Sequence, residues 1–186
     1  MVGGFSAVSG KPSYRRRLAF YRAGQYSVDM SACSSDFNIV LVAPEIPHNT
    51  GAVGRLCVCL GARLHLVRPL GFALTEHQVR RAGMDYWQHV DLSVHDSWDA
   101  YVEAEHPTQL IFSSTRGTKS YVDCDPKPGC ALVFGNESSG LPDDLYTRYA
   151  DALYCVPMPG PRARSLNLSL TVSAFAYEVL RQLTTG

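Results

Sequence analysis

From residue 38 onward, short runs of β-branched and aliphatic residues alternate with segments that carry helical spacing. This alternation is typical of an α/β domain, because each helix returns the chain to the sheet for another parallel strand. The sequence therefore predicts a mainly parallel sheet flanked by helices. We expect strands at 38–43, 63–67, 109–113, 131–135 and 152–156, and helices at 51–60, 97–105, 143–149 and 167–183.

The last predicted helix is apolar on two sides. One face carries Leu168, Val172, Phe175, Val179 and Leu183, and a second carries Leu166, Leu170, Ala174 and Tyr177. Such a helix needs two partners, which are its own sheet and either a second subunit or a larger core of the same chain.

The 186 residues are 46% hydrophobic and 18% charged, which is typical of one soluble globular domain. No apolar run approaches the roughly 18 residues that a membrane helix needs, so we expect a protein that does not span a membrane. Residues 37–186 are predicted to form one domain. Residues 1–36 are predicted to be a basic, flexible extension.

The formal net charge is zero, but residues 1–36 carry about +3 and the remainder about −3. A nucleic-acid partner would therefore need local basic clusters, and the candidates are Arg15–Arg17, Arg80 with Arg81, and Arg162 with Arg164. The first 36 residues are rich in Ser, Gly and Arg and poor in acids, as mitochondrial presequences are. We expect a cytoplasmic protein, or a mitochondrial one if this segment acts as a presequence.

The six cysteines form no C-x-x-C pair, and Cys57 and Cys59 point to different sides of a predicted helix. Their spacing predicts no zinc site, and we expect no metal. Scattered cysteines with apolar neighbours suit a reducing compartment, where they serve as small core residues.

Glycine- and proline-rich loops follow three predicted strands, at 44–47, 135–140 and 157–161. Open parallel sheets bind ligands beyond the carboxyl ends of their strands, where such loops gather. The sequence therefore predicts a ligand site at this edge of the sheet.

The first motif, N-x-G-x-x-x-R, comprises Asn49, Gly51 and Arg55. Asn49 can cap the following helix, Gly51 permits close backbone approach, and Arg55 can meet a bound anion. A dinucleotide-binding dehydrogenase is the weaker interpretation, because the first glycine of G-x-G-x-x-G is missing and Arg68 ends the second strand where an acid is expected.

Two further motifs follow along the chain. In Phe134-Gly135-Asn136-Glu137-Ser138-Ser139-Gly140-Leu141-Pro142, the glycines let main-chain groups reach a ligand directly. In residues 157–169, a proline-rich segment delivers Arg162, Arg164, Ser165 and Asn167 to the start of the final helix, where free amides favour anions. Ser165 can also cap that helix.

In this order, the three motifs resemble those of the TrmH-like branch of the SPOUT RNA methyltransferases. Segments 44–51, 63–65, 69–72 and 80–86 resemble the TrmL-like tRNA methyltransferases within that branch, and the resemblance covers residues 37 to about 183. Two departures are the extension 1–36, which has no counterpart in the minimal pattern, and the loop 159–164, which is one residue longer than expected.

The resemblance implies a carboxy-terminal trefoil knot, which general folding rules would not predict. It also implies that S-adenosylmethionine binds in a bent form within the knot. The residues that match cofactor-binding positions are Ser113, Gly135, Val156, Met158, Ser165 and Leu166.

The implied reaction is 2'-O-methylation of a tRNA ribose at the wobble nucleotide, either cytidine or a modified uridine, by a homodimer. The family assigns the arginine matching Arg55 as general base, although a guanidinium with a pKa above about 12 rarely releases its proton. Stabilising the alkoxide and gripping a phosphate suit a charged Arg55 better, and its part in proton removal stays open. Arg80, Arg81, Arg162 and Arg164 are candidate tRNA-phosphate contacts.

Five other residues are catalytic candidates. Asn49 and Asn167 would position the ribose and Arg55, and Glu137 would organise the loops. Ser165 would bridge cofactor and substrate, and Tyr177 is the fifth candidate. The non-enzymatic alternative is a SPOUT-fold RNA-binding protein without turnover. Intact matches at these positions argue against it.

Overall fold

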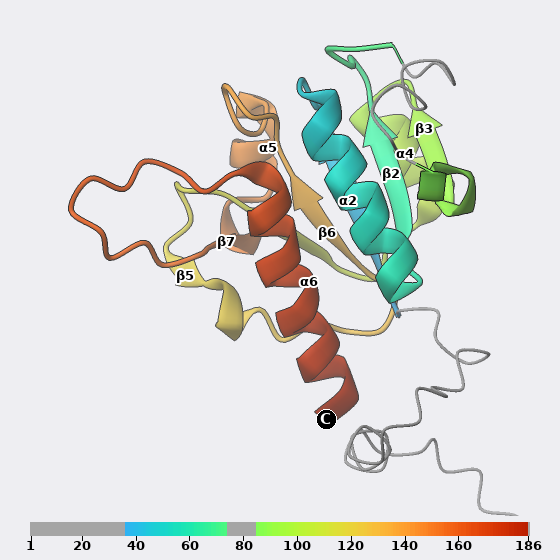
Figure 1. Cartoon of the computed structure of the whole chain (residues 1–186). Helices are drawn as coiled ribbons and strands as arrows, with labels where there is room; N and C mark the ends of the chain where they lie inside the picture. Colours follow the sequence, from blue (N-terminus) through green and yellow to red (C-terminus); the bar gives the residue numbers. More distant parts are fainter. Residues whose placement is uncertain (1–35, 74–84, 186) are drawn as a thin grey trace, which may run out of the picture.

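The computed structural model describes residues 36–73 and 85–185, and these form one seven-stranded sheet with strand order β3-β2-β1-β6-β4-β7-β5 (Figure 1). Every pairing between these strands is parallel, which confirms the predicted sheet. The strands are β1 (Phe37–Val42), β2 (Arg63–Val67), β3 (Leu92–His95), β4 (Leu110–Ser113), β5 (Lys119–Ser120), β6 (Cys130–Phe134) and β7 (Leu153–Cys155).

Helices cover both faces of the sheet. The helices are α2 (Pro47–Leu60), α4 (Trp98–Glu105), α5 (Asp143–Arg148) and α6 (Leu168–Thr185), with short 3-10 turns η3 (Asp85–His89), η4 (Tyr121–Asp123) and η5 (Ala150–Ala152). Side chains of α2 and α6 pack into one apolar cluster, and side chains of α4 and α5 pack into another. The sheet thus separates two cores.

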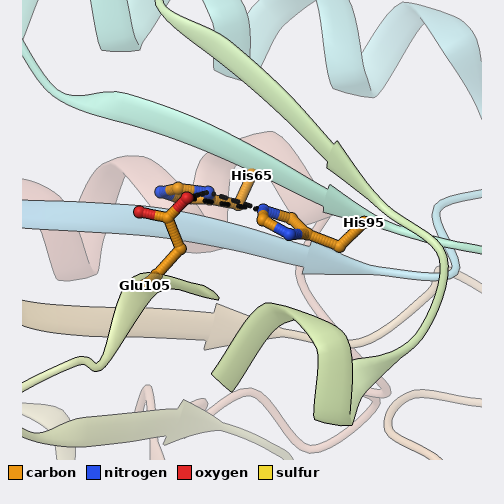
Figure 2. Close-up of side chains that lie close together, drawn as sticks. All are labelled: His65, His95 and Glu105. Carbon is orange, nitrogen blue, oxygen red and sulfur yellow. Dashed lines mark hydrogen bonds and ion pairs between the residues drawn. The ribbon is translucent and has the colours of Figure 1, made fainter. Parts of the chain in front are cut away.

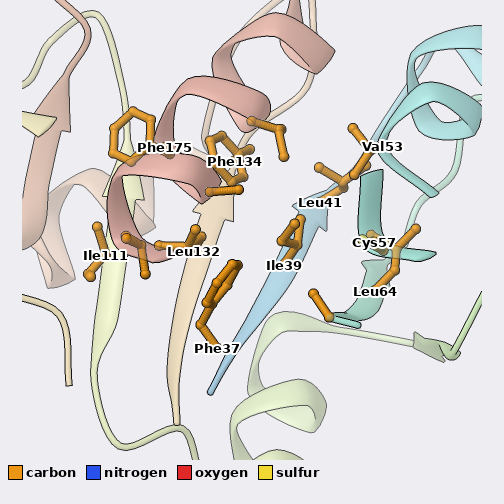
Figure 3. Close-up of a cluster of buried hydrophobic side chains, with 14 of the residues drawn as sticks. Phe37, Ile39, Leu41, Val53, Cys57, Leu64, Ile111, Leu132, Phe134 and Phe175 are labelled. Atoms are coloured by element: carbon orange, nitrogen blue, oxygen red, sulfur yellow. The ribbon is translucent and has the colours of Figure 1, made fainter. Parts of the chain in front are cut away.

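The central strands supply both cores by alternation. Along β1, Ile39 and Leu41 face α2 and α6 (Figure 3). Val40 and Val42 face α4 and α5. A strand buried on both sides must be apolar on both faces, which explains the apolar run from Ile39 to Val42 in β1 and the wholly apolar β6.

Helix α6 buries one of its two apolar faces. Val172, Phe175 and Val179 are fully buried against the sheet and α2. On the other face, Leu170 remains 60% exposed and Tyr177 56% exposed. The prediction of a buried face is confirmed, and on the second face the described residues leave Leu170 and Tyr177 exposed, while Ala174 is half-buried.

The predicted elements are confirmed with shifted ends, and two strands were not predicted. Edge strand β3 is short and half polar, and β5 has two residues, so neither carries a clear strand pattern. Helix α2 begins at Pro47, four residues before the predicted start, since proline suits the first turn of a helix.

The predicted cap at Asn49 is wrong. Ile46 occupies the N-cap position of α2 without a side-chain bond, and Asn49 lies inside the first turn. At the start of α6, the carboxamide oxygen of Asn167 accepts a hydrogen bond from the Ser169 amide at 2.9 Å. Asn167, rather than Ser165, therefore satisfies the first amides of this helix.

After β7 the chain runs through residues 156–167 and returns to α6, which packs beside α2 and against β6 (Figure 1). This return segment is the part of the chain in which the family resemblance implies a knot. Within the described residues, no helix has the length and apolar character that crossing a membrane requires.

Cysteines serve as core residues at three positions. Cys57, Cys124 and Cys130 are buried, and burial raises the pKa of their thiols to about 12, 11 and 12 respectively. Cys59 is exposed and Cys155 is half-buried, so the prediction of core cysteines holds for three of the five described.

We expect a protein lacking residues 1–35 to fold, because the first core strand begins at Phe37 and the deleted segment lacks apolar periodicity. Far-UV circular dichroism should show a cooperative thermal transition close to that of the full chain. A second truncation that ends after Leu41 removes most of a central strand and should abolish the transition. Aggregation of the first truncation would show that the tail is structural.

Candidate functional site

A cleft of about 530 Å³ lies at the carboxyl ends of β1, β4, β6 and β7. Its walls come from the loops that follow these strands and from the segment before α6, which confirms the predicted site at this edge. The lining includes Ile46, Asn49, residues 113–116, residues 134–140, Tyr146, residues 155–156, Met158, residues 164–168 and Thr171.

The carboxylate of Glu137 joins two of the cleft's loops. It accepts hydrogen bonds from the backbone amides of Glu45 and Ile46, at 2.9 and 3.2 Å, and from the Asn49 side-chain amide at 2.9 Å. Ser138 donates a further hydrogen bond to the Glu45 carboxylate. The loop after β6 thereby holds the loop after β1 in one position.

Asn49 extends this connection to the third motif. Its carboxamide oxygen accepts a hydrogen bond from the Asn167 side chain at 2.9 Å, and Asn49 itself is 5% exposed. A chain of hydrogen bonds therefore runs from Glu137 through Asn49 to Asn167. Residues separated by up to 118 positions in the sequence meet in one network.

The loop after β6 leaves no room for a side chain at Gly135. A Cβ atom there would lie 2.1 Å from the carbonyl carbon of Gly140, and Gly140 itself has a φ of +76°. The Asn136 carboxamide oxygen accepts hydrogen bonds from the amides of Ser138, Ser139 and Gly140. The loop is therefore fixed from within, and it presents main chain to the cleft.

All six predicted cofactor residues line the cleft: Ser113, Gly135, Val156, Met158, Ser165 and Leu166. The cleft volume is in the range of small-molecule sites, and its wall combines apolar side chains with main chain at a position where a Cβ has no space. Such a wall fits an adenine ring and an amino-acid group recognised by backbone hydrogen bonds.

Arg55 lies outside the cleft. Its guanidinium carbon sits 4.4 Å from the centre of the Tyr86 ring, and the Tyr86 hydroxyl donates to the Gly51 carbonyl at 3.0 Å. The predicted catalytic residues thus divide: Asn49, Glu137, Ser165 and Asn167 are gathered at the cleft, whereas Arg55 and Tyr177 are not.

Of the predicted RNA contacts, Arg164 lines the cleft and Arg162 is exposed in the same segment. Arg80 and Arg81 lie outside the described residues.

Sequence reasoning missed Arg116 and Tyr146. The Arg116 guanidinium stacks 4.2 Å from the Tyr146 ring centre, and the Ser114 hydroxyl donates to the Tyr146 hydroxyl at 3.2 Å. Both residues line the cleft. Arg116 could have been predicted from the polar, glycine-containing segment 113–117, because this segment follows a predicted strand and ligand sites lie beyond the carboxyl ends of parallel strands.

Comparisons with known proteins give a family match and related sequences. A model of the SpoU rRNA Methylase family matches residues 36–177. A tRNA (cytidine(34)-2'-O)-methyltransferase of Burkholderia ambifaria is 47% identical over 148 residues, which are 78% of this chain and 95% of that protein.

Solved structures share the fold. One, described as giving insights into 2-OH methylation of C/U34 on tRNA, is 46% identical with a TM-score of 0.74 and covers 81% of this chain and 97% of its own. An AdoMet-bound rRNA methyltransferase of Sinorhizobium meliloti is 25% identical with a TM-score of 0.69, over 86% of this chain and 62% of its own. These matches confirm the fold class expected from the motifs.

We expect Gly135→Ala to lower the free energy of unfolding by at least about 2 kcal/mol, because the added methyl group meets main chain that cannot move aside. Urea unfolding followed by fluorescence measures the change. Gly160→Ala is the matched control, since its Cβ would meet only the Ala163 side chain at 3.9 Å, and it should stay within about 0.5 kcal/mol of the parent. Equal stability of the two variants would contradict the proposed packing of the loop.

Proposed function

Because this chain belongs to the SpoU rRNA methylase family, we propose that it transfers the methyl group of S-adenosylmethionine to the ribose 2'-hydroxyl of nucleotide 34 in tRNA. The observation that carries the proposal is the hydrogen-bond chain from Glu137 through Asn49 to Asn167, which brings one residue of each motif together at the cleft. The names of the relatives supply the substrate.

The reaction forms a bond between the ribose oxygen and the methyl carbon, breaks the bond between that carbon and sulfur, and releases the hydroxyl proton. S-adenosylmethionine supplies an activated methyl group when bound. An in-line displacement of this kind depends mainly on alignment of the reacting atoms. The protein's contribution is therefore to hold the cofactor and the ribose in line, and to stabilise the charge that develops on the oxygen.

The cleft residues divide this work by position. Gly135, Val156 and Met158 offer main chain and apolar surface to the cofactor. Ser165 lines the cleft two residues before Asn167, where its hydroxyl is available to bridge cofactor and ribose. Asn49 and Asn167 hold each other through one hydrogen bond, and their fixed amides orient the ribose.

Arg55 contributes from outside the cleft of its own chain. Its stacking on Tyr86 fixes the guanidinium plane while leaving the residue exposed. A planar guanidinium can hold a phosphate in two hydrogen bonds and remain charged. We assign to Arg55 the grip on an RNA phosphate beside the reacting ribose and the stabilisation of the nascent alkoxide.

A two-fold homodimer through α6 completes the proposal. Leu166, Leu170 and Tyr177 are exposed apolar side chains of this region, and a second copy would cover them. Because α2 packs beside α6, the same interface brings Arg55 close to the second protomer. Arg162 and Arg164 in the segment that precedes α6 supply positive charge for tRNA.

The proposed function is tested by incubating purified protein with S-adenosylmethionine and total tRNA from cells that lack it, then mapping 2'-O-methyl groups. We expect the new methyl group at nucleotide 34 of a subset of tRNAs. Ribosomal RNA in the same reaction is the control for substrate class. Methylation of ribosomal RNA alone would reject the tRNA assignment, and cofactor binding without any methyl transfer would favour an inactive RNA-binding protein.

Arg55→Lys keeps the charge but removes the planar fork, so we expect turnover to fall by roughly 100-fold or more with cofactor affinity unchanged. Single-turnover methyl transfer to saturating tRNA, beside cofactor titration of the same preparation, measures both. Arg148→Lys on α5 is the matched control, because that arginine pairs with Asp99 on the opposite face of the sheet. Near-normal transfer by Arg55→Lys would remove Arg55 from the catalytic residues.

For the dimer, we expect the full chain to show twice the monomer mass by light scattering at micromolar concentration. Leu170→Glu places a charge on the exposed face of α6 and should yield monomers with much reduced transfer. Val94→Glu adds the same charge at an exposed valine of edge strand β3 and should remain dimeric. A monomeric parent with full activity would contradict the interface.

A further inference from the structure

Two histidines and a glutamate converge on the face of the sheet that α4 covers (Figure 2). His65 comes from β2, His95 from edge strand β3, and Glu105 from the last turn of α4. None of the three lines the cleft. The methyl-transfer chemistry leaves this cluster without a role.

The three potential ligand atoms are spaced as a metal ion requires. His65 Nδ1 lies 3.0 Å from His95 Nε2, and Glu105 Oε1 lies 3.8 Å from the first and 3.9 Å from the second. A point equidistant from three atoms with these separations is about 2.1 Å from each, within the Zn–N and Zn–O range. Side-chain rotations that shorten the two longer separations by about 0.5 Å and lengthen the N–N separation by about 0.3 Å give tetrahedral spacing.

A hydrogen bond between the imidazoles explains only part of this arrangement. One shared proton accounts for the 3.0 Å contact, but Glu105 Oε1 then lies beyond hydrogen-bond distance of both rings. Arg63 holds the other oxygen of Glu105. A cation between the three atoms would use His65, His95 and Glu105 Oε1 together as ligands.

The surroundings prepare the ligands for a cation. His65 is fully buried, and this burial lowers the pKa of its imidazole. Arg63 Nη1 donates to Glu105 Oε2 at 3.1 Å, which fixes the carboxylate with Oε1 toward the histidines. Tyr101 packs edge-on against both imidazoles, with ring centres 5.2 Å from each. Such supporting contacts orient metal ligands in proteins.

We propose that His65, His95 and Glu105 bind one Zn²⁺ ion. Two imidazoles and one carboxylate are a recurrent zinc ligand set, with a water molecule completing the tetrahedron, whereas Mg²⁺ and Ca²⁺ prefer oxygen ligands alone. The ion joins the edge strand β3 and the end of α4 to β2. Its effect is on stability of this edge of the sheet, and the methyl-transfer cleft lies elsewhere.

The test uses the full chain without a polyhistidine tag, stripped of metal with a chelator and then equilibrated with Zn²⁺. After desalting, elemental analysis should find about one zinc per chain. A Zn²⁺ concentration about 100 times its Kd should raise Tm by roughly 5 °C or more. His95→Gln should lower the affinity for Zn²⁺ by at least about 100-fold and remove the Tm shift. S-adenosylmethionine titration of that variant should stay unchanged, as evidence of folding.

His89→Gln is the matched control, since it replaces an exposed histidine at the end of η3 and should retain zinc. Glu105→Gln, which preserves shape, gives a second reading if His95→Gln fails to fold. The proposal is overturned if the parent retains no zinc, or if the ligand variants retain as much as the parent, because the zinc would then be bound by other residues. Displacement of zinc by equimolar Fe²⁺ would overturn the choice of metal.

Discussion

One carboxylate holds the loop after β1 against the loop after β6 and, through Asn49, reaches the segment before α6. Glu137 lies just after a buried strand, and it accepts hydrogen bonds from two backbone amides and one side-chain amide of the loop and helix that follow β1. Hydrogen bonds to an ionised acceptor are stronger than neutral ones, and three of them fix a direction as well as a distance. Through Asn49 the same group determines where Asn167, and therefore the first turn of α6, must lie.

This arrangement is possible because the sheet is parallel throughout its described strands. Parallel strands deliver their carboxyl ends to one edge, so short loops from β1, β4, β6 and β7 reach a common space. Parallel strands need long crossover connections, and these connections contain the helices that cover both faces of the sheet. Cleft and cores are therefore products of the same connectivity, although they use different residues.

Sequence patterns predicted the elements that burial dictates. The residues from Ile39 to Val42 in β1 and all of β6 are apolar, and the motif residues Asn49, Glu137 and Asn167 could be placed at one edge from strand ends alone. Strand ends do not predict which way a side chain on a helix surface points. Arg55 follows Asn49 on the same helix, yet its side chain packs on Tyr86 and lies outside the cleft. The stacking of Arg116 on Tyr146 likewise joins the loop after β4 to helix α5, and the approach of these two segments depends on strand order.

The His65, His95 and Glu105 cluster was hidden for a related reason. The expectation of no metal came from cysteine spacing, whereas these ligand atoms meet only through the register of β2 against β3, which pairs Val67 with His95 and leaves His65 two residues away on the same face. Edge strand β3 itself was not predicted, so that register was not available. A ligand cluster that depends on the pairing of β2 with β3 cannot be predicted from the spacing of residues along the sequence.

The closeness of Gly135 to Gly140 bears on how this protein can change over evolutionary time. Main-chain atoms line the cleft at Gly135, where no Cβ fits. A point substitution there cannot add or remove a group that recognises the ligand, and it can only disrupt the loop. Selectivity for the small molecule at that wall is therefore resistant to gradual drift. Exposed arginines such as Arg162 and Arg164 can be substituted without a steric clash. Preference for a particular nucleic acid can therefore change more readily than preference for the small molecule.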